Sequence, residues 1–213
     1  MNRRNFFKAG LLSTLGVAGH AMSNSGPIKL SQSTPNEIEG PFYPVMAQKD
    51  KDFDLTNIEG RNQEALGQKI IIHGIVLDTQ GNPVEGATVD LWQANAAGRY
   101  AHPHDSNTAP IDQNFQGCAI VPTGKSGEFR FKTILPGIYP VGGGWSRPPH
   151  IHFKVTKKGY VELTTQMYFP DHKVNQVHRL LQRKTKQEQA LMIAKKSVDK
   201  PNSFYYQIII EKV

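Results

Sequence analysis

The sequence predicts an all-β fold: an antiparallel β-sandwich core with an extended N-terminal arm and a short helical insertion before the last strand. Short runs of β-branched and aromatic residues recur along the chain, glycine and proline separate them, and only residues 174–197 space their apolar residues as a helix does. The length of 213 residues suits one domain with tails. A charged content of 20% is ordinary for a globular protein and argues against a disordered or membrane-embedded body.

The first element, residues 1–21, resembles an export signal. Arg3 and Arg4 precede Phe-Phe-Lys, a short apolar run covers residues 9–18, and small residues follow it. This run is too short to span a membrane, which takes about 20 residues. The adjacent arginines resemble a twin-arginine signal peptide, so we expect a periplasmic or secreted protein that is free of the membrane once the signal is removed. The alternative is an ordinary secretory leader whose two arginines are neighbours by chance.

An extended arm, residues 22–68, follows the leader, because this stretch is rich in Ser, Pro, Gly and Asn. The remaining residues, 69–213, form the sandwich domain. Strands are expected at 69–77, 87–93, 119–122, 128–132, 150–156, 161–168 and 204–211. Within residues 174–197, apolar residues recur among charged ones, which predicts two short helices.

The net charge of +7 is unevenly placed, and its placement excludes one class of function. The excess of lysine and arginine lies in the leader and in residues 171–200, and no basic stripe with interleaved aromatic residues occurs elsewhere. We therefore expect no nucleic-acid partner and interpret residues 184–200 as a solvated helix face. The single cysteine, Cys118, excludes an intramolecular disulfide and a metal centre built from several thiolates.

Two histidines in one predicted strand are candidate metal ligands. His150 and His152 are two residues apart, and a strand repeats its side-chain direction every second residue, so both imidazoles point the same way. That geometry suits one metal ion bound by both rings. A second pair, His102 and His104, lies on a proline-flanked loop, where we expect a solvated role or a supporting role beside the site. Three further histidines have no partner pattern, and no function is expected for them: His20, His172 and His178.

The residues that complete a site around this pair are open at this point. No Asp or Glu occurs in residues 138–156, and Glu162 on the next predicted strand is one alternative ligand. Two tyrosines are the other candidates: Tyr139 shortly precedes the histidines, and Tyr100 follows the strand at 87–93. Phenolate is a hard, anionic ligand that favours ferric iron, whereas two histidines with a carboxylate are typical of ferrous iron.

Several segments together resemble the intradiol ring-cleavage dioxygenases. The main ones are 91–100 (LWQANAAGRY), 137–140 (GIYP) and 147–153 (RPPHIHF), with 39–43 (EGPFY) and 165–169 (TQMYF) in addition. These blocks occur in the family's order over residues 36–170. The similarity is closest to the iron-binding chain of the family's protocatechuate-type subgroup.

The resemblance implies a β-sandwich with one ferric ion, Fe(3+), bound by Tyr100, Tyr139, His150 and His152. It implies a catalytic Arg147 beside the metal, where a fixed cation stabilises a substrate carbanion. Tyr139 has a catalytic role as well, because in the family the matching tyrosinate leaves the metal as substrate arrives and can accept a proton. The resemblance also assigns Gln166 and Tyr168 to the substrate pocket.

The implied reaction is cleavage of a catechol-type, protocatechuate-like aromatic diol between its two hydroxylated carbons with O2, giving a muconate-type diacid. The implied assembly is a homo-oligomer, with or without a partner chain that completes the pocket. One departure concerns residues 141–144, where the subgroup has an aromatic and a basic residue and this chain has the looser, smaller Val-Gly-Gly-Gly. We therefore expect a differently substituted catechol.

Two other classes of protein fit parts of the sequence. Residues 74–91 also resemble transthyretin-like and surface-adhesion domains, so the alternative function is that of an exported, non-enzymatic β-sandwich binding module. Such modules lack the set of two tyrosines and two histidines. An extradiol dioxygenase is the second alternative, and it requires two histidines and a carboxylate on ferrous iron.

Overall fold

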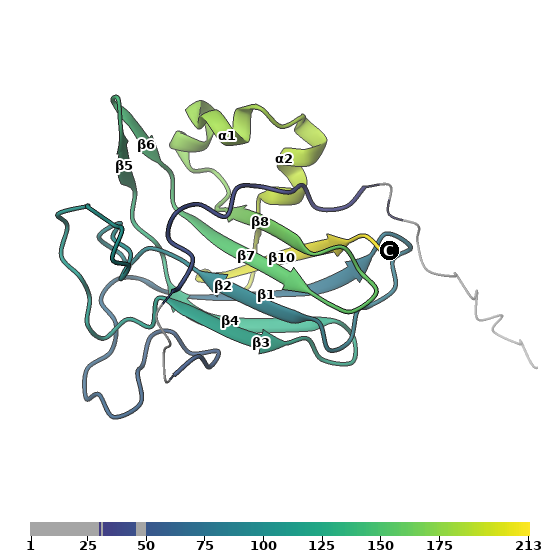
Figure 1. Ribbon diagram of the computed structural model, residues 1–213, viewed down its shortest axis with the longest axis horizontal. Helices are drawn as coiled ribbons and strands as arrows, with labels where there is room; N and C mark the ends of the chain where they lie inside the picture. Colours follow the sequence, from purple (N-terminus) through teal and green to yellow (C-terminus); the bar gives the residue numbers. More distant parts are fainter. Residues whose placement is uncertain (1–29, 31, 46–49) are drawn as a thin grey trace, which may run out of the picture.

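The computed structural model describes residues 30, 32–45 and 50–213. The expected export signal, residues 1–21, lies outside the described residues, and so does His20. The described residues form two four-stranded sheets, a two-stranded hairpin and a group of short helices (Figure 1). No helix in this part of the chain is long and apolar enough to cross a membrane.

The two four-stranded sheets form the sandwich that the sequence predicts. In spatial order, the first sheet contains β4 (Glu128–Ile134), β1 (Lys69–Asp78), β10 (Ser203–Ile210) and β9 (Lys195–Lys196). The second contains β3 (Cys118–Pro122), β2 (Thr88–Trp92), β7 (His150–Thr156) and β8 (Leu163–Tyr168). Every predicted strand is present, and the observed ends differ from the expected ones by at most two residues.

One pair of neighbouring strands departs from the expected antiparallel arrangement. β1 and β10 are parallel, with Ile71 opposite Ser203 and Asp78 opposite Ile210. The other neighbours in the two sheets are antiparallel. The reason is topological: β1 begins the domain and β10 ends it, and the chain builds the second sheet between them, which supplies the long crossover that parallel neighbours require.

The core lies between the two sheets and follows the alternation of their strands. On β1, Ile70, Ile72 and Val76 are buried, while the alternate residues Ile71, His73 and Ile75 are partly exposed. From the second sheet, the Phe153 ring lies 5.3 Å from the Tyr206 ring of the first sheet, measured between centroids. Each sheet therefore packs one apolar face against the other sheet, and the side chains on its outer face are not needed for the core.

Short helices lie against β8, within the segment where the sequence predicts them. They are η1 (Lys173–Val177), α1 (Arg179–Gln182) and α2 (Lys186–Met192). A capping box begins α2, because the Thr185 hydroxyl accepts the Glu188 N–H and the Glu188 carboxylate accepts the Thr185 N–H. Leu181 and Met192 pack on Tyr168 of β8. The end of the predicted helical segment forms β9 instead, which pairs with β10.

The N-terminal arm, which the sequence places at residues 22–68, runs along both sheets (the dark segment in Figure 1). The Thr34 N–H donates to β10 and the Glu37 N–H donates to β8. Farther along the arm, the Leu55 N–H donates to β4, and the Lys51 carbonyl accepts from β3. The arm thus pairs with backbone groups that strand edges otherwise leave open.

The hairpin of β5 (Tyr139–Gly142) and β6 (Trp145–Arg147) was not predicted, and it projects beside α1 (Figure 1). Its turn contains Gly142, Gly143 and Gly144 at φ values of 90°, 59° and 72°. Glycine adopts this left-handed backbone at little cost, whereas other residues do not. The stretch 141–144, which we expected to be loose, is therefore a defined turn that holds two strands together.

Candidate metal centre

The two candidate histidines lie on the outer face of the second sheet. Along β7, Ile151 and Phe153 belong to the core, so the alternating His150 and His152 point to the opposite side. Each of these histidines is 2% exposed, and their ring centroids are 4.9 Å apart. The structure thus brings both imidazoles to one buried place.

Neighbouring strands add three large side chains to this face. Trp92 of β2 and Gln166 of β8 are the register partners of His152, and Tyr168 of β8 is the partner of His150. Paired residues on adjacent strands share a face. The Trp92 ring stacks on His152, with centroids 4.8 Å apart and an interplanar angle of 15°. The Tyr168 and His150 centroids are 6.0 Å apart.

The β5–β6 hairpin supplies Tyr139 and Arg147, which are register partners. Both side chains are buried. The Tyr139 hydroxyl lies 3.4 Å from Nε2 of His150. Because β6 continues through two prolines into β7, Arg147 is held three residues before His150.

A turn after β2 brings Tyr100 to the same place. The Asn95 Oδ1 organises this turn by accepting two of its backbone N–H groups, each at 2.9 Å. Gly98, at φ 78°, sits where this turn crosses the segment leading to β5, and a Cβ there would collide with the carbonyl that precedes Tyr139. The Tyr100 ring consequently meets the Tyr139 ring edge-on, with centroids 5.7 Å apart.

The N-terminal arm covers the site. The Phe42 ring centroid is 4.7 Å from that of Tyr100, and the Tyr43 ring lies edge-on to Trp92 at 4.9 Å. The cluster of tyrosines and histidines is therefore buried although it occupies the outer face of a sheet. Burial of this kind strengthens electrostatic interactions inside the site.

The donor atoms fit a bound metal ion. The His150 Nδ1–H donates to the Pro148 carbonyl at 2.7 Å, which leaves Nε2 as the free donor atom facing the phenol 3.4 Å away. Burial, with the Arg147 charge, lowers the pKa of His150 and of His152, so both rings are neutral at pH 7. The Tyr100 hydroxyl and His152 Nδ1 are buried without a hydrogen-bond partner among the described residues. Buried polar atoms in this state point to a missing ligand or water.

The two phenols complete a hard donor set. Burial raises the pKa of Tyr100 and of Tyr139, and the neighbouring Tyr139 adds to the rise at Tyr100. The Arg147 charge acts in the opposite direction on both pKa values. A bound cation would favour the phenolate forms further. Two neutral imidazoles with two phenolates suit ferric iron.

Carboxylates are not part of this donor set. Within residues 30, 32–45 and 50–213, no three His, Cys, Asp or Glu side chains gather closely enough to hold a metal ion. Glu162, the alternative ligand, is exposed and lies with Lys157 and Tyr160 beyond the far end of β7. The extradiol alternative, which needs a carboxylate ligand, therefore lacks support.

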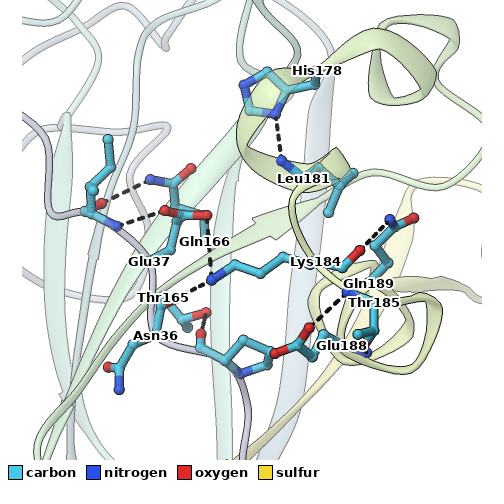
Figure 2. Close-up of polar contacts among 12 residues, drawn as sticks. Asn36, Glu37, Thr165, Gln166, His178, Leu181, Lys184, Thr185, Glu188 and Gln189 are labelled. Carbon is cyan, nitrogen blue, oxygen red and sulfur yellow. Dashed lines mark hydrogen bonds and ion pairs between the residues drawn. The ribbon is translucent and has the colours of Figure 1, made fainter.

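Arg147 is a buried cation, 5% exposed, and it forms no salt bridge in the described part of the chain. Its Nη2 donates to the Gln166 Oε1, which also accepts the Tyr168 hydroxyl at 2.9 Å. The Gln166 Nε2 donates at 2.8 Å to the Ile38 carbonyl in the arm, so the amide has one orientation (Figure 2). This network holds an uncompensated positive charge beside the tyrosines and histidines.

Of the described histidines outside the donor set, only His178 lies in an environment that the sequence did not predict. His102 and His104 lie on a loop beside the site, and the His102 ring contacts Phe42 rather than the donor set. His178, for which no role was expected, is fully buried and stacks on Trp145 at 5.5 Å. No local sequence pattern marks it, because the contact joins the helical segment to the hairpin.

Comparison with known proteins begins with a family model described as Dioxygenase, which matches residues 38–209. The protocatechuate 3,4-dioxygenase beta chain of Burkholderia cepacia is 42% identical over 152 residues, covering 68% of this chain and 64% of that protein. Catechol 1,2-dioxygenase 1 of Acinetobacter lwoffii is 35% identical over 176 residues, covering 72% of this chain and 55% of that protein. The chain thus spans between about half and two thirds of the length of these relatives.

Solved structures share the fold. The dioxygenase domain of a dioxygenase carbohydrate-binding protein fusion from Streptomyces sp. SirexAA-E gives a TM-score of 0.64 at 24% identity, covering 85% of this chain and 100% of that one. The 3-chlorocatechol 1,2-dioxygenase of Rhodococcus opacus 1CP gives 0.63 at 24% identity, covering 87% and 74%. With the family model matched over most of the sequence, the chain belongs to the intradiol dioxygenase family.

Proposed function

We propose that this chain is a ferric-iron-dependent intradiol dioxygenase that cleaves a catechol-type aromatic diol between its two hydroxylated carbons with O2, giving a muconate-type diacid. The observation that carries the proposal is the convergence of Tyr100, Tyr139, His150 and His152 beside Arg147, a buried cation without a salt bridge among the described residues. The names of the relatives, protocatechuate 3,4-dioxygenase and catechol 1,2-dioxygenase, support the same reaction class.

The proposed iron ligands are the two phenols and the two imidazoles. When bound, ferric iron would supply Lewis-acid activation of the diol toward O2. Such an ion would bind the Tyr100 hydroxyl oxygen, which has no hydrogen-bond partner within the described part of the chain, and the unprotonated Nε2 of His150. The burial of all four side chains keeps competing water away from them.

Tyr139 is the proposed proton acceptor. Its hydroxyl oxygen lies 3.4 Å from His150 Nε2, at the edge of the cluster that faces Arg147 across the hairpin. As a phenolate, this oxygen can take a hydroxyl proton from an entering diol, and the product of that step is a neutral tyrosine. Burial raises the pKa of Tyr139, so its phenolate, which a bound cation would favour, is a strong base once formed.

Arg147 is the proposed electrostatic catalyst. Its guanidinium is held by Gln166, which is held in turn by Tyr168 and by the arm. A fixed cation in a buried site stabilises negative charge that develops on a ring carbon, and it needs no reorganisation during the reaction. Gln166 and Tyr168 act in this proposal by positioning Arg147 at the edge of the substrate pocket.

The finer points of the proposal concern substrate, assembly and location. We propose a substituted, protocatechuate-like catechol, and Val141–Gly144, which form a small turn beside the site, leave the substituent to be recognised by other residues. We propose a homo-oligomer, with or without a partner chain, because a relative is named as a beta chain. We propose export through a twin-arginine signal, on the strength of Arg3 and Arg4 alone.

Metal content and colour test the proposed function. Purified protein should contain one iron per chain and be red-brown, because phenolate-to-ferric charge transfer absorbs visible light. His152→Ala should lose most of the iron, whereas Tyr139→Phe should keep iron with a weaker or blue-shifted band. His104→Ala, on the nearby loop, is the matched control and should leave both unchanged. Colourless, iron-free protein after preparation with added iron would instead favour the non-enzymatic binding module.

A further inference from the structure

Three buried N–H groups gather on one side of the site without an acceptor. Trp145 Nε1, Arg147 Nε and His178 Nε2 are enclosed, and none has a hydrogen-bond partner among the residues that the structure covers. Native proteins rarely keep a buried donor unsatisfied unless a water, an ion or a ligand supplies the acceptor. The three side chains are neighbours, because the Trp145 and His178 rings stack and the Arg147 charge acts on His178.

His178 sits between two aromatic rings. Its ring stacks on Trp145 with centroids 5.5 Å apart and an interplanar angle of 16°, and it lies 5.4 Å from the Tyr168 ring. Its Nδ1 accepts the Leu181 N–H, as Figure 2 shows. A neutral imidazole has one donor and one acceptor nitrogen, so Nε2 carries the proton. Burial, with the Arg147 charge, lowers the pKa of His178 to about 4, which keeps the ring neutral at pH 7.

This stack extends the wall of the proposed active site. Trp145 and Arg147 are two residues apart on β6 and therefore share the face that carries Arg147 into the site. On the other side of His178, the Tyr168 ring lies 6.0 Å from His150. The rings of Trp145, His178 and Tyr168 thus run in contact from the hairpin to the proposed metal ligands.

The charge at this wall is positive. Arg147 is unpaired in the described chain, and the Arg179 guanidinium lies 5.7 Å from the Trp145 ring. The charge of the Glu37 carboxylate contributes to the raised pKa of Tyr168, but this carboxylate is paired with Lys184 at 4.0 Å (Figure 2). Unsatisfied donors under a positive potential favour an oxygen acceptor, either a hydroxyl or a carboxylate.

We infer that Trp145 and His178 bind an oxygen substituent on the ring of the diol, in addition to its two vicinal hydroxyls, and thereby determine which catechols the protein prefers. The inference rests on the proposed function, because it takes the diol to lie beside His150 and Arg147. It assigns His178 a binding role that its sequence context does not reveal. No covalent step is involved.

Anaerobic binding tests this role without turnover. Calorimetric titrations of the iron-loaded protein without O2 should compare three diols: 3,4-dihydroxybenzoate, 1,2,4-trihydroxybenzene and 4-methylcatechol. His178→Phe keeps a flat ring against Trp145 and removes the N–H. We expect this variant to raise the dissociation constant about 5-fold for the hydroxyl-bearing diol or about 10- to 100-fold for the carboxylate-bearing one. The diol whose binding weakens identifies the substituent that is bound. The dissociation constant of 4-methylcatechol should change by less than about twofold.

The matched control is His73→Phe, a histidine on β1 of the other sheet whose ring lies 5.6 Å from Tyr205. It should change none of the three constants. Trp145→Phe provides the second variant and carries the test if His178→Phe does not fold. Equal weakening of all three diols, or no weakening, would overturn the inference.

Oxygen uptake separates this inference from the proposed function. Substituent-dependent binding through His178 in a protein that consumes no O2 with any diol would retain the inference and reject the proposed activity. Oxygen uptake with binding that is indifferent to His178→Phe and Trp145→Phe would retain the activity and reject the inference.

Discussion

Replacing Arg147 with methionine separates the catalytic contribution of the buried charge from its contribution to stability. Methionine is unbranched and of similar reach, so it fills most of the space while removing the charge and the N–H donors. Arg147 is 5% exposed and donates to the Gln166 Oε1. It is not a proposed iron ligand, so the variant should keep its iron and its colour.

Two opposing effects set the stability of this variant. The lost charge-assisted hydrogen bond costs about 1.5–3 kcal/mol. The Gln166 Oε1 keeps a second donor, the Tyr168 hydroxyl at 2.9 Å, so no buried acceptor is left unsatisfied. The desolvation penalty of a guanidinium that lacks a counter-ion in the described residues also disappears. We therefore expect the free energy of unfolding to change by less than about 1.5 kcal/mol.

The effect on turnover should be far larger. Removing a preorganised electrostatic donor typically lowers the rate by about 10²–10³, which corresponds to about 3–4 kcal/mol of transition-state stabilisation. Arg147→Lys should restore little of the rate, because an ammonium lacks the planar fork that Gln166 positions. The measurements are oxygen uptake with a panel of catechols, iron content, and urea unfolding followed by circular dichroism.

The reasoning fails if Arg147→Met retains iron and turns over within about threefold of the wild type, since that is about 0.65 kcal/mol. Arg147 would then be a positioning residue for the β5–β6 hairpin. A loss of more than about 3 kcal/mol in the free energy of unfolding would contradict the stability argument separately, because it would mean that the contacts of the guanidinium outweigh its desolvation penalty.

Three further outcomes are expected. Gly98→Ala should lower the free energy of unfolding by about 2–4 kcal/mol and reduce iron content, because it combines a left-handed φ of 78° with a backbone collision. Gly117→Ala is the control, because its backbone is ordinary and a Cβ there meets only one atom of the described residues, at a van der Waals distance of 3.9 Å; equal urea midpoints for the two variants would contradict the close-approach argument. Cys118 is buried and its pKa is raised to about 11, so its alkylation at pH 8 should be at least about 100-fold slower in the native protein than in denaturant. Mass spectrometry measures both alkylation rates, and similar rates would show that the thiol is accessible. Replacing Arg3 and Arg4 together with lysine should leave precursor in the cytoplasm on cell fractionation, whereas normal export of this variant would indicate the general secretory route.

The sandwich could be predicted because its strands carry their own local signals. Alternating burial along β1 and turn residues between the strands are visible in the sequence, and the expected ends differ from the observed ones by at most two residues. The parallel pairing of β1 with β10 could not be predicted, because it joins segments more than a hundred residues apart. The β5–β6 hairpin was missed because three consecutive glycines are typical of a loose loop, and only their φ values identify a tight turn.

The sequence alone could predict the part of the site that lies on a single strand. The spacing of His150 and His152 places both on one face without any knowledge of the fold. Tyr100 and Tyr139 were candidates from the sequence, but only family resemblance selected them over Glu162, since the crossing at Gly98 that joins them is a tertiary contact. His178 had no signal at all, because its stack on the hairpin depends on how the helical segment folds back.

The division of the site between elements has a mechanical consequence. His150 and His152 lie in the middle of a four-stranded sheet whose other face is the core, so their rings are fixed by the packing of Ile151 and Phe153. Tyr139 lies on a two-stranded hairpin that ends in a glycine turn. A two-stranded hairpin is the less rigid support. If one protein donor yields its place to an entering diol, the structure therefore favours Tyr139 over either histidine.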